Sequence, residues 1–229
     1  MSLASYSKNV AWVTGGSGDI GDVIVGRLRK EKVRVTSLSS KNFDISNMME
    51  IQEYIRLVSK KNYPDILICN AGINNPELIE KQSISDLEKI VNTNLMGHIT
   101  LIKAVLPHMA ARRFGRIVII SSIYSQRARS GRSAYSLSKS ALDSFMRSVA
   151  IEYADKGILA NSVAPGFIDT KLTSKNNKKK TLSKIITQIP TKRLGTPQEV
   201  SELVWFLASK KNTYITGQTI SIDGGFSIL

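Results

Sequence analysis

The chain has 229 residues, a hydrophobic fraction of 42% and one cysteine, values that suit a globular domain with a sizeable core. No apolar stretch approaches the roughly 18 residues of a membrane span, and the start MSLASYSKN lacks the apolar core of a signal peptide. A lone Cys69 excludes an internal disulfide and a cysteine-based metal cluster. We therefore expect a cytoplasmic protein with no metal site and no membrane contact.

The net charge of +14 is unevenly distributed. Residues 1–88 hold eleven basic and eleven acidic side chains, whereas residues 89–229 hold twenty-one basic and seven acidic ones. Such an excess reflects either a lysine-rich proteome or a positive field that attracts an anionic partner. Nucleic acid is not the expected partner, because no nucleic-acid-binding motif accompanies the charge.

Strand and helix patterns alternate along the chain. Short apolar runs predict strands over residues 10–16, 33–38, 65–72, 115–122, 158–166 and 216–225. Longer amphipathic stretches predict helices over residues 19–31, 47–61, 133–157 and 196–211, and one long helix or two over residues 84–113. This alternation predicts an α/β fold: a single Rossmann-type domain over residues 1–229, in which helices cover both faces of a doubly wound parallel sheet.

Two local features qualify this prediction. Only residues 39–47 separate the second expected strand from the next helix, whereas neighbouring parallel strands normally need a crossover of a dozen or more residues. We therefore expect a shortened crossover without its helix, and a short or irregular third strand around residues 42–45. Pro107 is expected to bend or break the last turns of the helix over 84–113.

A glycine-rich turn, TGGSGDIG, joins the first expected strand to the first helix. Glycine lets the backbone turn tightly and approach a pyrophosphate, and the helix N-terminus supplies free N–H groups. The spacing of Gly15, Gly18 and Gly21 in this strand–turn–helix context predicts a dinucleotide-binding site.

Ser122, Tyr135 and Lys139 form a second constellation. The tyrosine and the lysine are four residues apart, so they share one face of a helix. An ammonium group beside a phenol favours the phenolate and lowers its pKa, which makes tyrosine a usable acid and base near neutral pH. Ser122 follows the apolar run IVII, at the end of a buried strand, where the sites of α/β proteins form.

With these motifs the chain resembles the short-chain dehydrogenase/reductase superfamily, in its compact single-domain branch, over nearly its whole length. Further matches are NAG at residues 70–72, NTNLMG around Asn94, and Pro165-Gly166. The segments RLGTPQEV and ITGQTISIDGG resemble the C-terminal part of 3-oxoacyl-[acyl-carrier-protein] reductases. The resemblance implies that the catalytic residues are Asn94, Ser122, Tyr135 and Lys139. It implies that the cofactor-binding residues are Thr14, Gly15, Ser17, Gly18, Asp19, Ile20, Gly21, Ser37, Ser39, Lys41, Asp44, Ile45, Asn70, Ala71, Gly72, Tyr135, Lys139, Pro165, Gly166, Ile168 and Thr170.

The implied reaction is reversible hydride transfer between a nicotinamide cofactor and a carbonyl or alcohol carbon. Tyr135 would exchange the proton, and Lys139 would lower the tyrosine pKa and hold the nicotinamide ribose. Ser122 would donate a hydrogen bond to the substrate oxygen. Asn94 would hold a water that links Lys139 to solvent. His98 is expected to be structural.

The end of the second expected strand distinguishes NADP from NAD. NAD enzymes usually carry an acidic residue there, whereas this chain has serines and Lys41 over residues 37–41. We therefore expect NADP(H), with NAD(H) as the alternative. Asp19 stands where most compact members of the family have glycine, and we expect its side chain to turn away from the pyrophosphate. Asp44 is the expected adenine contact.

The segment that follows Pro165-Gly166 is expected to be a substrate lid, at about residues 171–193. It has no acidic residue, and Arg127, Arg129 and Arg132 lie in the loop between Ser122 and Tyr135. This charge favours an anionic substrate or carrier, such as an acyl group on acyl carrier protein, a CoA thioester or a sugar nucleotide.

The resemblance places 3-oxoacyl-[acyl-carrier-protein] reductase first among the expected functions. A sugar, polyol or sugar-nucleotide reductase is the alternative enzyme, and an NADP-binding regulatory scaffold is the alternative from another class. The resemblance also implies a homotetramer, or else a dimer.

Overall fold

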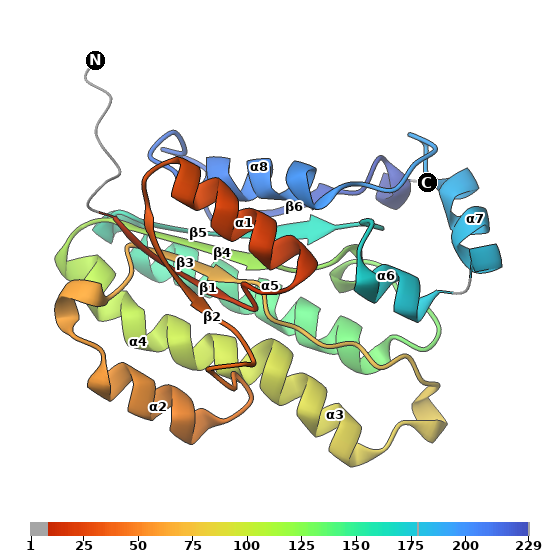
Figure 1. Ribbon diagram of the computed structural model, residues 1–229, viewed down its shortest axis with the longest axis horizontal. Coiled ribbons are helices and arrows are strands. Elements are labelled where there is room, and N and C mark those ends of the chain that lie inside the picture. Colours follow the sequence, from red (N-terminus) through yellow and green to blue (C-terminus); the bar gives the residue numbers. More distant parts are fainter. Residues whose placement is uncertain (1–8, 178, 229) are drawn as a thin grey trace.

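Six parallel strands form the centre of the computed structural model, which describes residues 9–177 and 179–228 (Figure 1). Their order across the sheet is β2-β1-β3-β4-β5-β6. The strands are β1 (Val10–Thr14), β2 (Arg34–Leu38), β3 (Ile66–Cys69), β4 (Gly115–Ile120), β5 (Ile158–Pro165) and β6 (Thr219–Ile222). The predicted fold class is confirmed: a doubly wound α/β domain with a parallel sheet.

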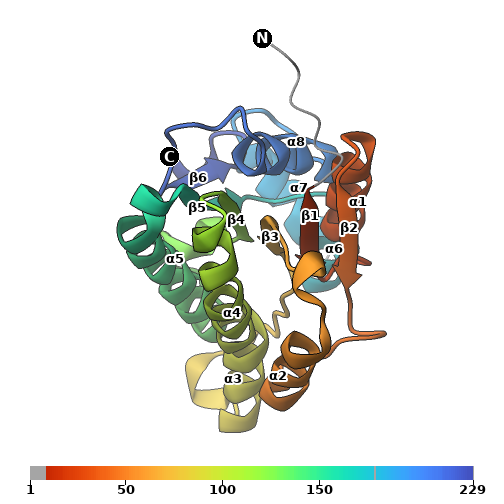
Figure 2. The ribbon, with the colours of Figure 1, turned by 90° about the vertical axis from the view of Figure 1, so that its left-hand side faces the viewer.

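Helices cover both faces of the sheet, as Figure 2 shows. On one face, α1 (Asp19–Lys30) packs beside α8 (Pro197–Ala208). The other face carries α2 (Met48–Leu57), α4 (Gly97–Ala111) and α5 (Ser133–Tyr153), with α3 (Ile84–Val91) preceding α4. Beyond the carboxyl ends of the strands lie α6 (Lys171–Asn176) and α7 (Lys179–Gln188) (Figure 1).

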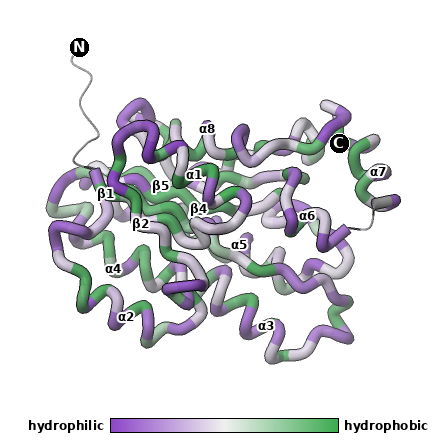
Figure 3. The backbone as a smooth tube through the Cα atoms, in the orientation of Figure 1, coloured by the Kyte–Doolittle hydropathy of each residue, from purple (hydrophilic) through white to green (hydrophobic). Residues whose placement is uncertain are grey.

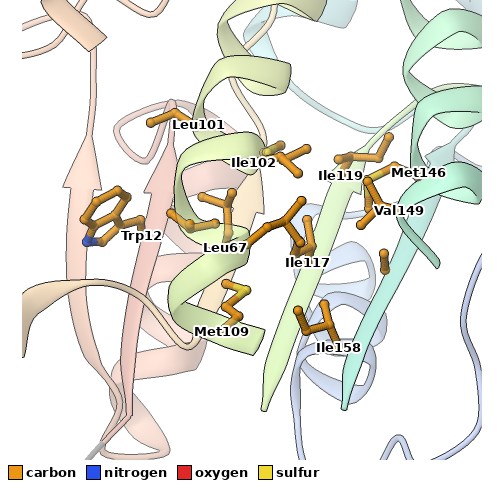
Figure 4. Close-up of a cluster of buried hydrophobic side chains, with 14 of the residues drawn as sticks. Trp12, Leu67, Leu101, Ile102, Met109, Ile117, Ile119, Met146, Val149 and Ile158 are labelled. Carbon is orange, nitrogen blue, oxygen red and sulfur yellow. The ribbon is translucent and has the colours of Figure 1, made fainter. Parts of the chain in front are cut away.

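Burial of apolar side chains between these layers forms two main cores. The larger one joins the sheet to α4 and α5 through residues such as Trp12, Leu67, Met109 and Ile117 (Figure 4). In Figure 3 the apolar segments accordingly concentrate in the strands and in the helix faces turned toward them. None of the helices in the described part of the chain is long and apolar enough to cross a bilayer.

After β2 the chain reaches α2 through a short loop, without the third strand that the sequence predicted. Residues 42–45 belong to no strand, so the expected third strand is wrong and β2 is an edge of the sheet. The Asn42 amide oxygen accepts hydrogen bonds from the backbone and hydroxyl of Ser39, and Asn47 caps α2. Because no further strand or helix intervenes, the chain turns directly into α2, and α2 makes the crossover to β3 on the other side of β1.

The expected helix over 84–113 is interrupted early rather than late. A π-helical turn, Asn92–Met96, separates α3 from α4. Pro107 does not break α4, which continues to Ala111, and a bend at this position stays a prediction. Both Lys103 and Pro107 are exposed, so water can satisfy the Lys103 carbonyl that proline cannot bond. The irregular turn instead contains Asn94, a predicted site residue.

Gly97 allows the loop after β2 to approach α4. A Cβ atom at this position would collide with the backbone oxygen of Ile45, which lies in that loop. The absence of a side chain at Gly97 therefore determines how closely residues 39–46 pack on the helix.

We predict that Gly97→Ala lowers the free energy of unfolding by about 1–3 kcal/mol, because backbone at Ile45 has to move. Urea unfolding measures this change. Gly26→Ala is the matched control, since Gly26 lies in α1 with open space around it and alanine there is expected to stabilise by about 0.5–1 kcal/mol. Equal midpoints for Gly97→Ala and the unsubstituted protein would contradict the role of Gly97.

Candidate active site

A cleft of about 780 Å³ opens at the carboxyl ends of the strands. It lies where the strand order reverses, since the chain moves from β1 to β2 on one side and later to β3 on the other. Such a switch point is where open parallel sheets bind their ligands. The cleft is bordered by the glycine turn, the loop after β2, the start of α5, and α6.

Most residues predicted from the sequence line this cleft. They are Gly15, Ser17, Gly18, Asp19, Ile20, Gly21, Asp44, Ile45, Asn70, Ala71, Gly72, Ser122, Tyr135, Lys139, Pro165, Gly166, Ile168 and Thr170. Five predicted residues are not part of its lining: Thr14, Ser37, Ser39, Lys41 and Asn94. Sequence reasoning missed other lining residues, among them Ser46, Tyr124 and Phe167.

Thr14 lies beneath the cleft and holds the glycine turn in place. Its hydroxyl oxygen accepts hydrogen bonds from the backbone amides of Asn70 (2.9 Å) and Ala71 (3.0 Å). The Asn70 side chain donates in return to the carbonyls of Thr14 and Gly15. Gly15 has a φ of 62°, and a Cβ atom at Gly21 would collide with the Gly15 oxygen. The turn therefore needs glycine at both positions.

The first amides of α1 face this turn without protein partners. The N–H groups of Asp19, Ile20 and Gly21 have no acceptor among the described residues. Free amides at the positive end of a helix dipole are a binding site for phosphate groups. The residues present therefore fit a dinucleotide, with its pyrophosphate at the start of α1.

The Asp19 side chain contacts the segment that was expected to form the lid. Its carboxylate accepts a hydrogen bond of 2.6 Å from the backbone N–H of Lys171, the first residue of α6. A carboxylate in the first turn of α1 also suits the helix dipole. The side chain thus connects the glycine turn to α6.

Ser122, Tyr135 and Lys139 come together at the cleft wall. All three side chains line the cleft, and the Lys139 ammonium lies 5.7 Å from the centre of the tyrosine ring. Burial raises the pKa of Tyr135, while the Ser122 hydrogen bond and the Arg132 guanidinium lower it. The Lys139 Nζ donates to the Ile120 carbonyl at 2.7 Å, and its expected effect on the tyrosine pKa stays a prediction.

Asp143 is a buried carboxylate near Lys139 that sequence reasoning missed. It lies one helical turn after Lys139 on α5 and is 4% exposed. One oxygen accepts a hydrogen bond from Ser121, whereas the other has no partner among the described residues. Burial lowers the pKa of Lys139 to about 8, and the negative charge of Asp143 opposes that effect. The (i, i+4) spacing of Lys139 and Asp143 is the sequence pattern that could have identified this carboxylate.

Asn94 is fully buried and clamps the segment after β3. Its amide donates to the Ile73 carbonyl (2.9 Å) and accepts from the Ile73 N–H (2.8 Å). These bonds give the side chain a positioning role. The water-holding role expected for it stays a prediction.

His98 joins this buried network in a structural role. Its Nδ1 lies 3.0 Å from the Asn94 carbonyl, and its Nε2 lies 3.1 Å from the Thr14 hydroxyl. Burial lowers the pKa of His98 to about 3, so the ring is neutral. Because a carbonyl only accepts, Nδ1 carries the hydrogen and Nε2 accepts from Thr14. The imidazole thus connects the glycine turn to the π-helical turn.

Known proteins are similar to this chain in sequence and fold over nearly their whole length. A family model described as enoyl-(acyl carrier protein) reductase matches residues 23–227. The chain is 35% identical to the 3-oxoacyl-[acyl-carrier-protein] reductase FabG of Buchnera aphidicola subsp. Acyrthosiphon pisum, with 98% of this chain and 100% of the relative covered. It is 33% identical to the acetoacetyl-CoA reductase of Cupriavidus necator, covering 96% and 98% of the two chains.

Among solved structures, the ligand-free aldohexose dehydrogenase of Thermoplasma acidophilum superposes with a TM-score of 0.91 at 30% identity. The superposition covers 100% of this chain and 97% of that one. The glycine turn, the Ser122–Tyr135 pair and this similarity agree. The chain therefore belongs to the short-chain dehydrogenase/reductase family of nicotinamide-dependent oxidoreductases.

Proposed function

We propose that this protein reduces the 3-oxo group of an acyl thioester with NADPH, as a 3-oxoacyl-[acyl-carrier-protein] reductase. The observation that carries the proposal is the placement of Ser122, Tyr135 and Lys139 together at the wall of a cleft whose other side is the start of α1. The similarity to FabG proteins and to an acetoacetyl-CoA reductase supports the choice of a 3-oxoacyl thioester.

The residues of this chain handle the proton. Ser122 hydrogen-bonds the substrate oxygen and orients the carbonyl toward Tyr135, whose hydroxyl donates its proton to that oxygen. The bound nicotinamide supplies the hydride that the carbonyl carbon accepts. The Lys139 and Arg132 cations stabilise the tyrosinate that remains, and the reverse direction uses the same groups with the proton moving back.

The charge around the cleft supports an anionic carrier. Lys171 and Lys175 of α6 line the cleft, and the described residues of the lid segment include no acid. Coenzyme A and acyl carrier protein are both acidic, so a positive rim would increase their rate of encounter. The lid segment would then contact the carrier while Tyr135 acts on the acyl group.

A second candidate is an aldose or polyol substrate. The similarity to an aldohexose dehydrogenase, at 30% identity and with complete coverage of this chain, favours it. The same Ser122 and Tyr135 would then act on a sugar hydroxyl in the oxidative direction.

We also infer that the cofactor is NADP(H). The segment after β2 offers a lining serine, Ser40, and an exposed neighbouring cation, Lys41, and no carboxylate lies at the end of the strand. A carboxylate there would bind the ribose hydroxyls of NAD and repel a 2′-phosphate. Ser37 and Ser39 do not line the cleft, and the Ser39 hydroxyl bonds Asn42. We assign the 2′-phosphate to Ser40 and Lys41 instead.

A homo-oligomer is part of the proposal. Large apolar side chains remain exposed along the outer side of the π-helical turn and α5: Met96, Leu137 and Ile151. Such side chains on adjacent helices are typical of a subunit interface, and we infer a dimer through this face, or a tetramer with a second interface.

Tyr135→Phe is expected to lower kcat with acetoacetyl-CoA by roughly 10²–10⁴, because it removes the proton donor. Binding of NADPH, followed by its fluorescence, is expected to stay unchanged. Tyr153→Phe, at the far end of α5, is the matched control and keeps full activity.

A panel with acetoacetyl-CoA and aldohexoses distinguishes the two candidate substrates. Normal turnover by Tyr135→Phe would refute the assignment, and NADPH binding without turnover of any carbonyl would favour a regulatory scaffold.

Lys41→Glu is expected to abolish a preference for NADPH over NADH. The substitution removes a cation from beside the 2′-phosphate and puts a repulsive carboxylate in its place, so NADPH binding should weaken roughly tenfold to hundredfold. Fluorescence titration of both cofactors measures the effect. Lys30→Glu, an equal charge change at the end of α1, should leave both affinities unaltered. The NADP assignment fails if the unsubstituted protein binds NADH as tightly as NADPH.

Asp143→Asn is expected to shift the alkaline limb of the pH profile of kcat/KM. The carboxylate raises the pKa of Lys139, so its loss lets Lys139 deprotonate at a lower pH than about 8. Activity that needs the ammonium would then decline roughly half a unit to one unit earlier as the pH rises. Ser121→Ala removes the hydrogen bond but not the charge, and should leave the limb in place. Identical limbs in all three proteins would contradict this role.

A further inference from the structure

Arg132 is a buried cation without a partner in the wall of the cleft. The residue is 6% exposed, its Nη1 atom is fully enclosed, and no described residue accepts a hydrogen bond or forms an ion pair with its side chain. It lines the cleft together with Tyr124 and Tyr135. Buried charges are normally paired, because an unpaired charge loses its hydration without compensation.

The surroundings of Arg132 add positive potential. It is the N-cap residue of α5, a 21-residue helix whose dipole is positive at this end. Burial lowers the pKa of Arg132, Arg129 lowers it further, and the two neighbouring tyrosines act in the opposite direction. None of the residues that the structure describes at this end of the cleft supplies a counter-charge.

The acidic residues of the cleft lie elsewhere. Among the described lining residues only Asp19 and Asp44 are acidic, and both come from the β1–β2 side of the sheet. Asp19 binds the N–H of Lys171, and Asp44 binds Ser46. Arg132, by contrast, begins α5, which packs on β5. Glu77 packs beside Gly131 through its backbone, but no described acid forms an ion pair with Arg132, which leaves the guanidinium open to an anionic ligand.

The other two arginines of the loop are engaged with the protein. Arg127 donates to the Phe226 carbonyl and lies over its ring. Arg129 donates to the Tyr124 hydroxyl at 2.6 Å and lies 5.5 Å from the centre of the Phe167 ring. Of the three arginines predicted to surround the entrance, the geometry thus selects Arg132 as the one for substrate.

We propose that Arg132 binds the carboxylate of a short 2-oxo or 3-oxo acid, so that the site reduces free oxo acids in addition to thioesters. The planar guanidinium matches both oxygens of a carboxylate. Arg132 precedes Tyr135 by three residues, about one helical turn, and both line the cleft. A short oxo acid whose carboxylate binds Arg132 would therefore present its carbonyl on the same wall of the cleft as Tyr135.

The inference rests on the proposed reaction, which supplies its redox balance. NADPH is oxidised as its hydride adds to the carbonyl carbon, and Tyr135 gives its proton to the oxygen. The product is the 2-hydroxy or 3-hydroxy acid, and the carboxylate is unchanged throughout.

The kinetic test compares pyruvate and acetoacetate with acetoacetyl-CoA. Arg132→Gln is expected to lower kcat/KM for the better oxo acid by about 100-fold, which corresponds to the loss of two charge-assisted hydrogen bonds. Arg132→Lys should retain part of the activity, because it keeps the charge but not the fork. Turnover of acetoacetyl-CoA should also fall, because Arg132 stabilises the tyrosinate. The role in carboxylate binding therefore requires kcat/KM for the oxo acid to fall at least about tenfold further than kcat/KM for the thioester. Arg147→Gln, an exposed position on the same helix, is the control for net charge.

A binding measurement decides the inference without turnover. Calorimetry on the NADPH-bound protein compares 3-hydroxybutyrate, which cannot react with the reduced cofactor, with its uncharged methyl ester. At least tenfold preference for the acid, lost in Arg132→Gln, is the expected result. No preference, or a preference that survives the substitution, overturns the role of Arg132. Failure of the proposed thioester reduction is a separate outcome, seen as absent turnover of acetoacetyl-CoA while the calorimetric preference persists.

Discussion

The hydroxyl group of Thr14 is the contact on which the cleft depends. It accepts hydrogen bonds from two successive amides after β3 and lies against the Nε2 of His98. These bonds tie the end of β1 to the end of β3, the two strands from which the chain departs in opposite directions. The crevice of a doubly wound sheet opens at this point. Through His98 the same hydroxyl is connected to Asn94, so the cofactor turn and the helix irregularity share one buried network.

A second constraint is the burial of charge beside Tyr135. Burial by itself disfavours the charged forms of both groups, the tyrosinate of Tyr135 and the ammonium of Lys139, whereas release of the proton leaves a tyrosinate. Three groups oppose it: Ser122 and Arg132 favour the tyrosinate, and Asp143 favours the ammonium of Lys139. At the wall of the cleft, desolvation and the neighbouring charges therefore act on these two pKa values in opposite directions. Arg132 is the one member of this set with no partner of its own among the described residues.

Much of this arrangement could be predicted from local patterns. The glycine turn, the spacing of Tyr135 and Lys139, and the alternation of strands and helices each depend on residues near one another in the chain, so their signals are readable in sequence. The absence of a strand after β2 and the position of the helix interruption could not be predicted from local sequence patterns. The first depends on which strands pair, and the second on how exposure lets α4 accommodate Pro107 while Asn94 binds Ile73.

The amino-acid sequence by itself determined the fold class and the position of the glycine turn, and it predicted Tyr135 as the proton donor, because periodicity and short spacings carry that information. Only the tertiary structure decided which of the loop arginines has no hydrogen-bond or ion-pair partner among the described residues. Arg127, Arg129 and Arg132 are alike in sequence, yet aromatic and carbonyl partners from Phe226, Tyr124 and Phe167 engage the first two. Those partners lie up to 99 residues away in the chain, so the unpaired state of Arg132 emerges only when the elements pack together.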